Sequence, residues 1–471
     1  MTAVLGVGGV AVAHDVRPSG TGPETAASNA APEIAWGPCE DLDDPQVDCG
    51  TVQVPLDHDD PGGPQVTIAL ERRRADDQDA RIGSLFANPG GPGAIGTPFG
   101  RYATDVFGEE ITRVFDVIGF DPRGVGKSSS VRCFSSDKEA DALWSQVRLV
   151  PLSEEEIRAA TDGAAAYSAA CGERGGELLG HLSTVNVARD LDLLRAAVGD
   201  ERLTYYGFSY GTLLGATYAN LYPDRVRAMV LDGAVDPEGR VDDRMANKLE
   251  RAAGFETALQ GMLDACAASG DGCALHGGDL TAHEKFARLR EHLRLGPVEH
   301  DGDIVTISSF TETVGSALYR RDRFEALTVA LADLYAVAFP ETVTARAERD
   351  LAPLSEKAAG RSGPWPDAAP FAEGWTSDES VLAGRANART ADQKDYSYNE
   401  TDVRFGVNCV DAPLPRTPES YRSFALGFEQ AHRTFGRAEA FGELPCATWP
   451  VVTEERYAGP WDASTRTILV V

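Results

Sequence analysis

The sequence predicts an α/β protein with a mostly parallel central sheet and a large, mainly helical insertion. Two observations lead to this prediction. Between residues 49 and 234, short apolar runs alternate with segments of helical periodicity, as in successive β-α-β units. After Pro237 the alternation stops, and helical or irregular segments rich in Trp and Pro continue to about residue 466. This stretch is too long for a loop, so we interpret it as an inserted helical domain.

The expected strands are short apolar runs bounded by turn residues, at residues 51–54, 65–71, 82–87, 114–120, 203–206, 228–231 and 467–471. Val187, Leu191, Leu194 and Val198 are spaced by 4, 3 and 4 residues, which predicts a helix that Gly199 ends. Further helices are expected over residues 212–222 and, within the insertion, near residues 255–263, 286–293 and 327–337.

Composition excludes several classes of protein. With 471 residues, 42% hydrophobic and 25% charged, the chain is neither disordered nor collagen-like. Lys and Arg number 44 and Asp and Glu 73, giving a net charge of −29, so we expect no nucleic acid or anionic membrane partner. No apolar run approaches the roughly 20 residues of a membrane-spanning helix. We expect a monomer.

The eight cysteines form no C-x-x-C pair, which argues against a zinc or redox motif. Joining neighbours in chain order gives four local loops that would suit disulfides in an oxidising compartment: Cys39 with Cys49, Cys133 with Cys171, Cys266 with Cys273 and Cys409 with Cys446. The alternative is buried free thiols in a cytosolic enzyme.

The N-terminus favours a secreted protein. Residues 1–13 are almost wholly apolar or glycine and end in Ala11-Val12-Ala13, a small-x-small pattern typical of signal-peptidase sites. No Lys or Arg precedes this stretch, so it is either a partial signal peptide whose start lies upstream or a mobile tail; we favour the first. Residues 14–35, rich in Ala, Ser, Thr, Pro and Gly, resemble a linker.

Gly207-Phe208-Ser209-Tyr210-Gly211 is a G-x-S-x-G sequence between an expected strand and an expected helix. Glycines flank a serine in such a tight turn because larger side chains tolerate its backbone angles badly. The turn lifts the serine hydroxyl above the sheet, and the helix N-terminus favours developing negative charge. The context predicts that Ser209 is a nucleophile, whereas the motif alone would also fit an ordinary strand-to-helix turn.

A second glycine-rich loop, Asn88-Pro89-Gly90-Gly91-Pro92-Gly93, follows the expected strand at residues 82–87. In this sheet that strand would end beside the serine, and glycines let backbone N–H groups point at a developing oxyanion. We expect the amides of Gly91 and Tyr210 to form the oxyanion hole. In isolation the loop would be interpreted as a surface turn.

Residues 121–128 end in Gly-Lys-Ser after a strand and superficially resemble a phosphate-binding loop. The G-x-x-x-x-G-K-S spacing requires glycine where Asp121 stands, and a carboxylate there would repel phosphate. We therefore interpret this segment as a structural turn.

Together these residues resemble a known family, the secreted α/β-hydrolase-fold tripeptidyl aminopeptidases related to prolyl iminopeptidases. The resemblance runs from about Trp36 to the last residue, and its most specific parts are residues 88–93, 120–128, 184–237, 408–411 and 446–450. It implies an α/β-hydrolase core, a helical cap between the sixth and seventh main strands, export, and release of short N-terminal peptides. The expected layout is a partial signal peptide (1–13), linker (14–35), core (36–237), cap and C-terminal peptidase section (238–465) and last core strand (466–471).

The sequence departs from the family in its catalytic triad. There the acid and then the histidine follow the strand that residues 467–471 resemble, and this sequence ends before both, so the core is expected to be incomplete and the chain inactive alone. We expect His276, His283, His292, His300 and His432 to be surface residues of the cap. Asp232 and Asp236 follow a core strand, but the family pattern makes them structural.

The favoured function is therefore a serine exopeptidase in which Ser209 forms an acyl-enzyme, with no metal or organic cofactor. Alternatives are a carboxylesterase of the same fold and a non-catalytic secreted binding protein that lacks the base. A break after a buried strand exposes a sheet edge, which argues against the binding protein as an evolved ending. An aminopeptidase must meet the substrate ammonium with carboxylates, whereas an esterase need not.

The expected partners are peptides with a free N-terminus, and acids late in the cap are the candidate groups to bind them. The segment 396–402 combines aromatic and acidic residues, and a further acid follows it. We expect Glu400, Asp402 or Asp411 to bind the ammonium. In so acidic a chain, the alternative is a solvated acidic surface.

Overall fold

A computed structural model describes residues 31–340, 396–452, 455–465 and 467–471. The expected signal peptide and most of the expected linker lie outside the described residues.

The central sheet has eight strands in the order β1-β2-β3-β5-β4-β6-β7-β10. Pairings among β1, β2, β3 and β5 are antiparallel, whereas β5, β4, β6, β7 and β10 run parallel. The strands are β1 (Ala35–Pro38), β2 (Val47–Pro55), β3 (Gln65–Arg73), β4 (Gly83–Asn88), β5 (Phe115–Asp121), β6 (Leu203–Phe208), β7 (Val226–Asp232) and β10 (Thr467–Val470). All seven predicted strands are confirmed; the short, Gly- and Pro-containing β1 was not predicted.

Helices cover both faces of this sheet. The central strands β4 and β5 are buried along their whole length, which explains why they are apolar runs without alternation. Helices α6 (Thr184–Ala197) and α7 (Tyr210–Leu221) pack over one face, and Leu191 and Leu214 belong to the core there. The other face carries α1 (Pro98–Arg101), α2 (Ala103–Phe107) and α3 (Glu109–Val114). The two predicted helices of this region, α6 and α7, are confirmed.

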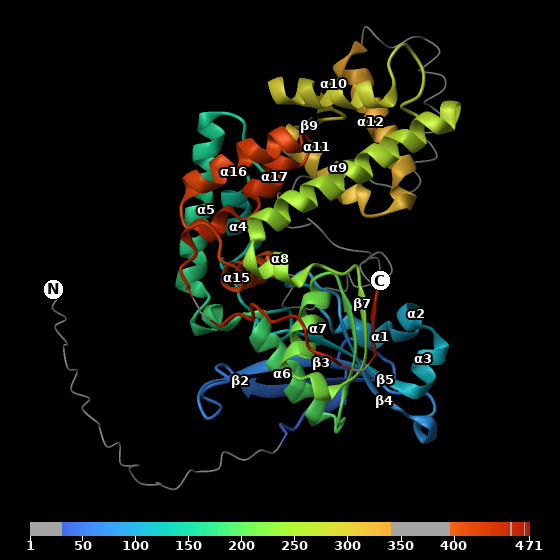
Figure 1. The fold of residues 1–471 in the computed structure, drawn as a ribbon, viewed down its shortest axis with the longest axis vertical. Helices are drawn as coiled ribbons and strands as arrows, with labels where there is room; N and C mark the ends of the chain where they lie inside the picture. Colours follow the sequence, from blue (N-terminus) through green and yellow to red (C-terminus); the bar gives the residue numbers. More distant parts are fainter. Residues whose placement is uncertain (1–30, 341–395, 453–454, 466) are drawn as a thin grey trace, which may run out of the picture.

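A helical layer between β7 and β10 in the chain covers one end of the sheet (Figure 1). It contains α8 (Pro237–Asp242), α9 (Arg244–Ser269), α10 (Ala282–Leu295), α11 (Ile307–Leu318), α12 (Phe324–Ala338), α15 (Asn399–Asp411), α16 (Pro418–Ala431) and α17 (Gly436–Phe441). Helices α9, α10 and α12 confirm the three predicted there. A small hairpin, β8 (Val298–His300) with β9 (Asp303–Val305), was not predicted. Within this layer, α8 and α15 lie on the side toward the sheet (Figure 1).

Two helices that precede β6 in the chain pack with this layer. They are α4 (Asp137–Trp144) and α5 (Glu154–Arg174). The ring of Tyr167 in α5 lies 5.4 Å from that of Phe405 in α15 and 6.2 Å from that of Trp449, measured between centroids. The layer over the sheet therefore combines the insertion with a segment from the first half of the chain.

The structure contains four disulfides, and they join the same pairs that neighbour-in-order pairing predicts. Cys133–Cys171 ties the segment after β5 to α5, and Cys409–Cys446 ties α15 to the 3₁₀ helix η7 (Leu444–Thr448). These two bridges therefore cross-link segments that pack together in the helical layer. In the described part of the chain no helix combines the length and apolarity that crossing a membrane requires.

Candidate active site

Ser209 occupies a sharp turn between β6 and α7. Its backbone has a φ of 53° and a ψ of −121°, angles that cost a non-glycine residue about 1–3 kcal/mol. A Cβ atom added to Gly207 would lie 2.3 Å from the carbonyl oxygen of Gly211, so the close approach across the turn requires glycine. The geometry is that of a nucleophile elbow, as the motif predicted.

Hydrogen bonds fix this turn to the neighbouring strand. The Ser209 amide donates to the Asp232 carbonyl oxygen at the end of β7 (2.9 Å). The Thr212 hydroxyl donates to the Ser209 carbonyl oxygen (2.7 Å) and accepts from the Val235 amide (3.0 Å). These bonds hold the strained backbone in place, and the Ser209 residue remains partly exposed.

The glycine-rich loop after β4 touches the elbow. Strands β4 and β6 are neighbours, with Asn88 opposite Gly207. A Cβ atom on Gly90 would lie 2.4 Å from the Phe208 carbonyl oxygen and 2.9 Å from the Tyr210 nitrogen. Within the described part of the chain, neither the Gly91 nor the Tyr210 amide donates a backbone hydrogen bond. Their environment is compatible with the expected oxyanion hole, which stays a proposal.

Asp121 anchors the turn that superficially resembles a phosphate loop. Its fully buried carboxylate accepts hydrogen bonds from the amides of Gly96 (2.9 Å), Thr97 (3.0 Å) and Lys127 (2.9 Å). Those three donors belong to the turn itself and to the segment just after the glycine-rich loop. The carboxylate therefore has a structural role, as expected.

Two of the three acids proposed to bind the ammonium are engaged inside the protein. Asp402 accepts hydrogen bonds from the Cys133 amide (2.8 Å) and from the hydroxyls of Tyr167 (2.8 Å) and Tyr396. Asp411 accepts from the amide (2.9 Å) and hydroxyl (2.5 Å) of Thr184. Burial raises the pKa of Asp402 to about 7 and that of Asp411 to about 6, despite these donors.

Glu400 lies beside the glycine-rich loop. A Cβ atom on Gly93 would lie 2.5 Å from the Glu400 carbonyl oxygen, so the first turn of α15 packs directly on that loop. The residue is partly exposed. Desolvation raises the pKa of the Glu400 carboxyl group to about 7, and the positive charge of Arg404 opposes this rise. Of the three acids, Glu400 is thus the one whose position next to the loop is established.

Sequence reasoning missed the cations that accompany these acids. Arg404 follows Glu400 by four residues on α15, so both lie on the same side of the helix. Arg240 in α8 donates to the Asn408 side chain (2.8 Å), and burial lowers the pKa of its guanidinium to about 9. The i, i+4 spacing of Glu400 and Arg404 would have predicted that their side chains lie close together, but only if a helix had been predicted for that segment.

The structure contradicts the prediction that all five named histidines of the cap are surface residues. His300 is not a surface residue, because only 9% of it is exposed and it lies in the β8–β9 hairpin. His276 and His283 do lie near acids in exposed parts of the insertion, 3.9 Å from Asp271 and 3.2 Å from Asp264. Among the described residues, no histidine is hydrogen-bonded to Ser209.

The acids at the end of β7 and just after it make structural contacts, as expected. The Asp232 carboxylate accepts a hydrogen bond from the Tyr206 hydroxyl (3.0 Å). Asp236 caps α8 by accepting from the amides of Glu238 (3.1 Å) and Gly239 (3.2 Å).

Comparison with known proteins agrees with this fold and site. Residues 84–271 match the family model described as the alpha/beta hydrolase fold. A tripeptidyl aminopeptidase of Streptomyces lividans is 33% identical over 433 residues, covering 90% of this chain and 72% of the relative. The serine protease Hip1 of Mycobacterium tuberculosis is 31% identical (89% and 75% covered), and a carboxylesterase B of that organism is 32% identical (92% and 76% covered).

The chain is therefore an α/β-hydrolase-fold protein. It belongs to the tripeptidyl aminopeptidase family.

Proposed function

We propose that Ser209 is the nucleophile of a serine peptidase that releases short peptides, tripeptides by family resemblance, from free N-termini. The observation that supports this most directly is the strained turn of Ser209 with the glycine-rich loop packed against it. The similarity to a tripeptidyl aminopeptidase and to a serine protease supports the peptidase class.

In the proposed reaction the Ser209 hydroxyl oxygen attacks the carbonyl carbon of the scissile amide. A base takes the hydroxyl proton and passes it to the leaving amine as the C–N bond breaks. The amides of Gly91 and Tyr210 stabilise the oxyanion, and the N-terminus of α7 adds favourable potential. Water then attacks the acyl-enzyme and releases the short peptide as a carboxylic acid.

The base is the part of this reaction that the described residues do not supply. No described histidine is hydrogen-bonded to Ser209. The 471 residues alone are therefore proposed to be close to inactive, and activity requires a histidine and an acid placed after β10, as in the family. Adding them should raise turnover by several orders of magnitude.

Glu400 is our candidate for binding the substrate ammonium. An exopeptidase has to hold this group at a fixed distance from its serine, and Glu400 packs on the loop that reaches Ser209. Asp402 and Asp411 were equal candidates from sequence, but their oxygens accept hydrogen bonds from buried groups. They would support α15 while Glu400 makes the contact.

The test compares free and N-acetylated peptide anilides in a form of the protein that carries the additional histidine and acid. Ser209→Ala should lower turnover by several orders of magnitude without unfolding the protein. Glu400→Gln should weaken cleavage of the free-amine substrate by roughly 1.5–3 kcal/mol and leave slow cleavage of the acetylated one unchanged. Glu419→Gln is the matched control, because Glu419 is an exposed acid in the first turn of α16.

Equal cleavage of free and acetylated peptides by the parent protein would overturn the aminopeptidase proposal. It would favour a carboxylesterase, the second candidate, which the similarity to a carboxylesterase B supports. An esterase would hydrolyse neutral p-nitrophenyl esters faster than peptides, and Glu400→Gln would not change that rate.

We also propose that the protein is exported and acts as a monomer on peptides. The four disulfides support an oxidising compartment. Detection of the mature protein outside cells of the source organism, and a single 50 kDa species in sedimentation, would test the two statements.

A further inference from the structure

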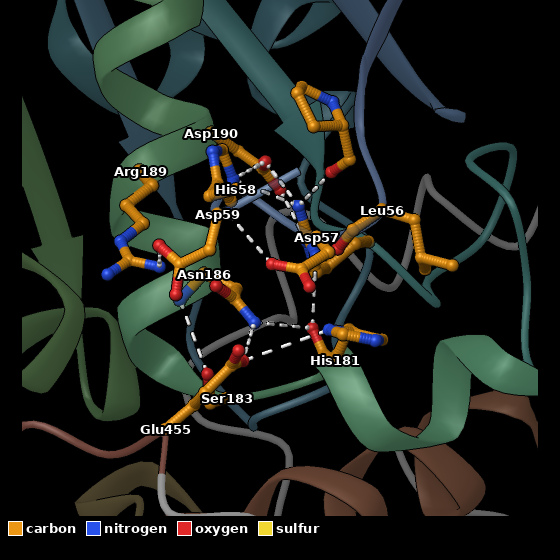
Figure 2. A network of polar contacts seen from close by, with 12 residues as sticks. Leu56, Asp57, His58, Asp59, His181, Ser183, Asn186, Arg189, Asp190 and Glu455 are labelled. Carbon is orange, nitrogen blue, oxygen red and sulfur yellow. Dashed lines mark hydrogen bonds and ion pairs between the residues drawn. The ribbon is translucent and has the colours of Figure 1, made fainter. Parts of the chain in front are cut away.

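Three side chains from distant parts of the sequence face one another at one end of the sheet, as Figure 2 shows. Asp57 lies in the turn after β2, and His181 is the last residue of the 3₁₀ helix η2 (Glu177–His181). Glu455 belongs to the segment 455–465 that precedes β10. One ligand-type atom from each side chain lies within 4.8 Å of the other two.

The His181 imidazole has a nitrogen available at this point. Its Nδ1 atom is buried and has no hydrogen-bond partner among the described residues. The nearest carboxylate oxygen, Oε2 of Glu455, is 3.8 Å away, which is too far for a hydrogen bond. A buried imidazole nitrogen that faces a carboxylate across such a gap is unusual, because buried polar atoms are normally satisfied.

Other contacts hold the two carboxylates in position. The Asn186 side-chain amide donates to Glu455 Oε2 (2.8 Å), and the Asp59 backbone amide donates to an oxygen of Asp57 (2.8 Å). Asn186 is itself fully buried on α6. Such outer contacts are what orients the ligands of a metal ion.

Two arginines near the three side chains, Arg123 and Arg189, contact other acids. Arg123 makes two hydrogen bonds to Asp190, of 2.6 and 2.7 Å, and His58 also contacts that carboxylate (2.9 Å). Arg189 lies 3.7 Å from Asp59. Arg123 also donates to the His181 carbonyl oxygen (3.1 Å), and in Figure 2 Arg189 lies beside Asp59 and not between His181 and Glu455.

We propose that Asp57, His181 and Glu455 bind a divalent transition-metal ion of the Zn²⁺ type. One imidazole nitrogen and two carboxylates are ligands that Zn²⁺ accepts at about 2.0–2.2 Å, with water in the fourth position of a tetrahedron. Ligand atoms in such a tetrahedron are about 3.4 Å apart, so the side chains would close in by about 1 Å. The two negative charges match the charge of the ion.

The ion would act structurally rather than in the peptidase reaction. Strand β2 is four positions from β6 in the sheet, about 19 Å by the usual strand spacing, so the site is separate from Ser209. Bound metal would clamp the segment before β10 onto η2 and onto the turn after β2. This inference does not depend on the proposed function.

The experiment titrates Zn²⁺ alone into the chelator-treated full chain by calorimetry. We expect one ion per chain, and at least tenfold weaker binding in His181→Ala and in Glu455→Gln. The two side chains are partly exposed, His181 to 24% and Glu455 to 28%, so both variants should fold. Circular dichroism checks that they do. His283→Ala, which removes an imidazole beside the single acid Asp264, is the matched control and should bind like the parent.

Co²⁺ gives a second readout that does not depend on affinity. Its visible absorption reports nitrogen and oxygen ligands in a four-coordinate site, and we expect His181→Ala to abolish this band while His283→Ala keeps it. Binding that both site variants leave unchanged would overturn the proposal, as would no binding by the parent at about 100-fold excess Zn²⁺.

Discussion

The backbone of Ser209 combines a functional position with a conformational cost. Because glycine adopts a positive φ readily, Ser209→Gly should remove part of the strain. We expect the free energy of unfolding to rise by about 1 kcal/mol, as measured in urea. Ser209→Ala keeps a Cβ atom and should leave the free energy within about 0.5 kcal/mol of the parent.

Comparing the free energies of unfolding of the two variants tests whether the turn at Ser209 stores strain. If Ser209→Gly were as stable as or less stable than Ser209→Ala, the turn would not be storing strain. Both variants should be inactive in any assay that depends on the serine hydroxyl, so stability and activity would separate at one position.

The raised pKa of Glu400 predicts a pH dependence of substrate binding. Burial raises this pKa from 4.5 to about 7, so the carboxyl group loses its charge as the pH falls through neutrality. In the form that carries the additional histidine and acid, the KM for free-amine peptides should rise as the pH is lowered from 8 to 6. Glu400→Gln should show a high KM with little dependence on pH in this range. Steady-state kinetics measures both profiles, and parallel profiles would remove Glu400 from ammonium binding.

The raised pKa of Glu400 also makes the free energy of unfolding depend on pH. The folded pKa lies above the unfolded value, so the folded state holds this proton more tightly. The resulting stabilisation is fully present below about pH 4.5 and is lost as the pH rises through about 7. In urea unfolding, the parent should therefore lose more stability over this window than Glu400→Gln does.

At the scale of elements, a buried group of charges joins α9 to the end of the helical layer. The fully buried Glu443 accepts from Arg244 (2.6 Å), and it lies 3.1 Å from Lys248. The positive charges of these two residues hold the pKa of Glu443 well below its usual range, although burial acts in the opposite direction. This carboxylate is therefore ionised at all ordinary pH values.

Removing the negative charge of Glu443 should destabilise the protein strongly, because the buried Arg244 loses its carboxylate partner and Lys248 keeps only Glu439. We expect Glu443→Gln to lower the free energy of unfolding by about 3–5 kcal/mol. Glu154→Gln is the control, since Glu154 pairs with Arg422 on the exposed surface and should cost less than about 1 kcal/mol. Chemical denaturation of both variants measures the difference; equal losses would contradict the role of burial.

At the scale of the whole molecule, disulfides occur both at the edge of the sheet (Cys39–Cys49) and in the helical layer. Each bridge joins neighbours in cysteine order, so we expect mass spectrometry of non-reduced digests to find the four pairs and no free thiol. Free Cys133 and Cys171, or a crossed pairing, would contradict this.

Cys133–Cys171 should matter for stability because it closes a long loop. Its separation of 38 residues corresponds to about 4 kcal/mol in the chain-entropy description. The double variant Cys133→Ser, Cys171→Ser should therefore unfold at lower denaturant than the parent. Cys266–Cys273, with a separation of 7, is the matched short loop, and its removal should cost about 1.5 kcal/mol less.

Local patterns in the sequence were sufficient to predict the elements and the sharp turn at Ser209. Apolar runs predicted seven strands of the sheet, and the glycines around Ser209 predicted the elbow, because both depend on neighbouring residues and on backbone sterics. The cysteine pairs were accessible for a similar reason, since each joins consecutive cysteines. The short strand β1 escaped because its four residues carry no periodic signal.

Only the tertiary structure distinguished among the acids of α15 and brought Asp57, His181 and Glu455 together. Glu400, Asp402 and Asp411 look equivalent in sequence, but packing places one on the glycine-rich loop and buries the other two against hydrogen-bond donors from residues more than 200 positions away. The sequence by itself predicted the fold class and the sharp turn that carries Ser209, since those follow from local sterics and periodicity. How each carboxylate is placed depends on long-range packing and desolvation, and no local pattern encodes these.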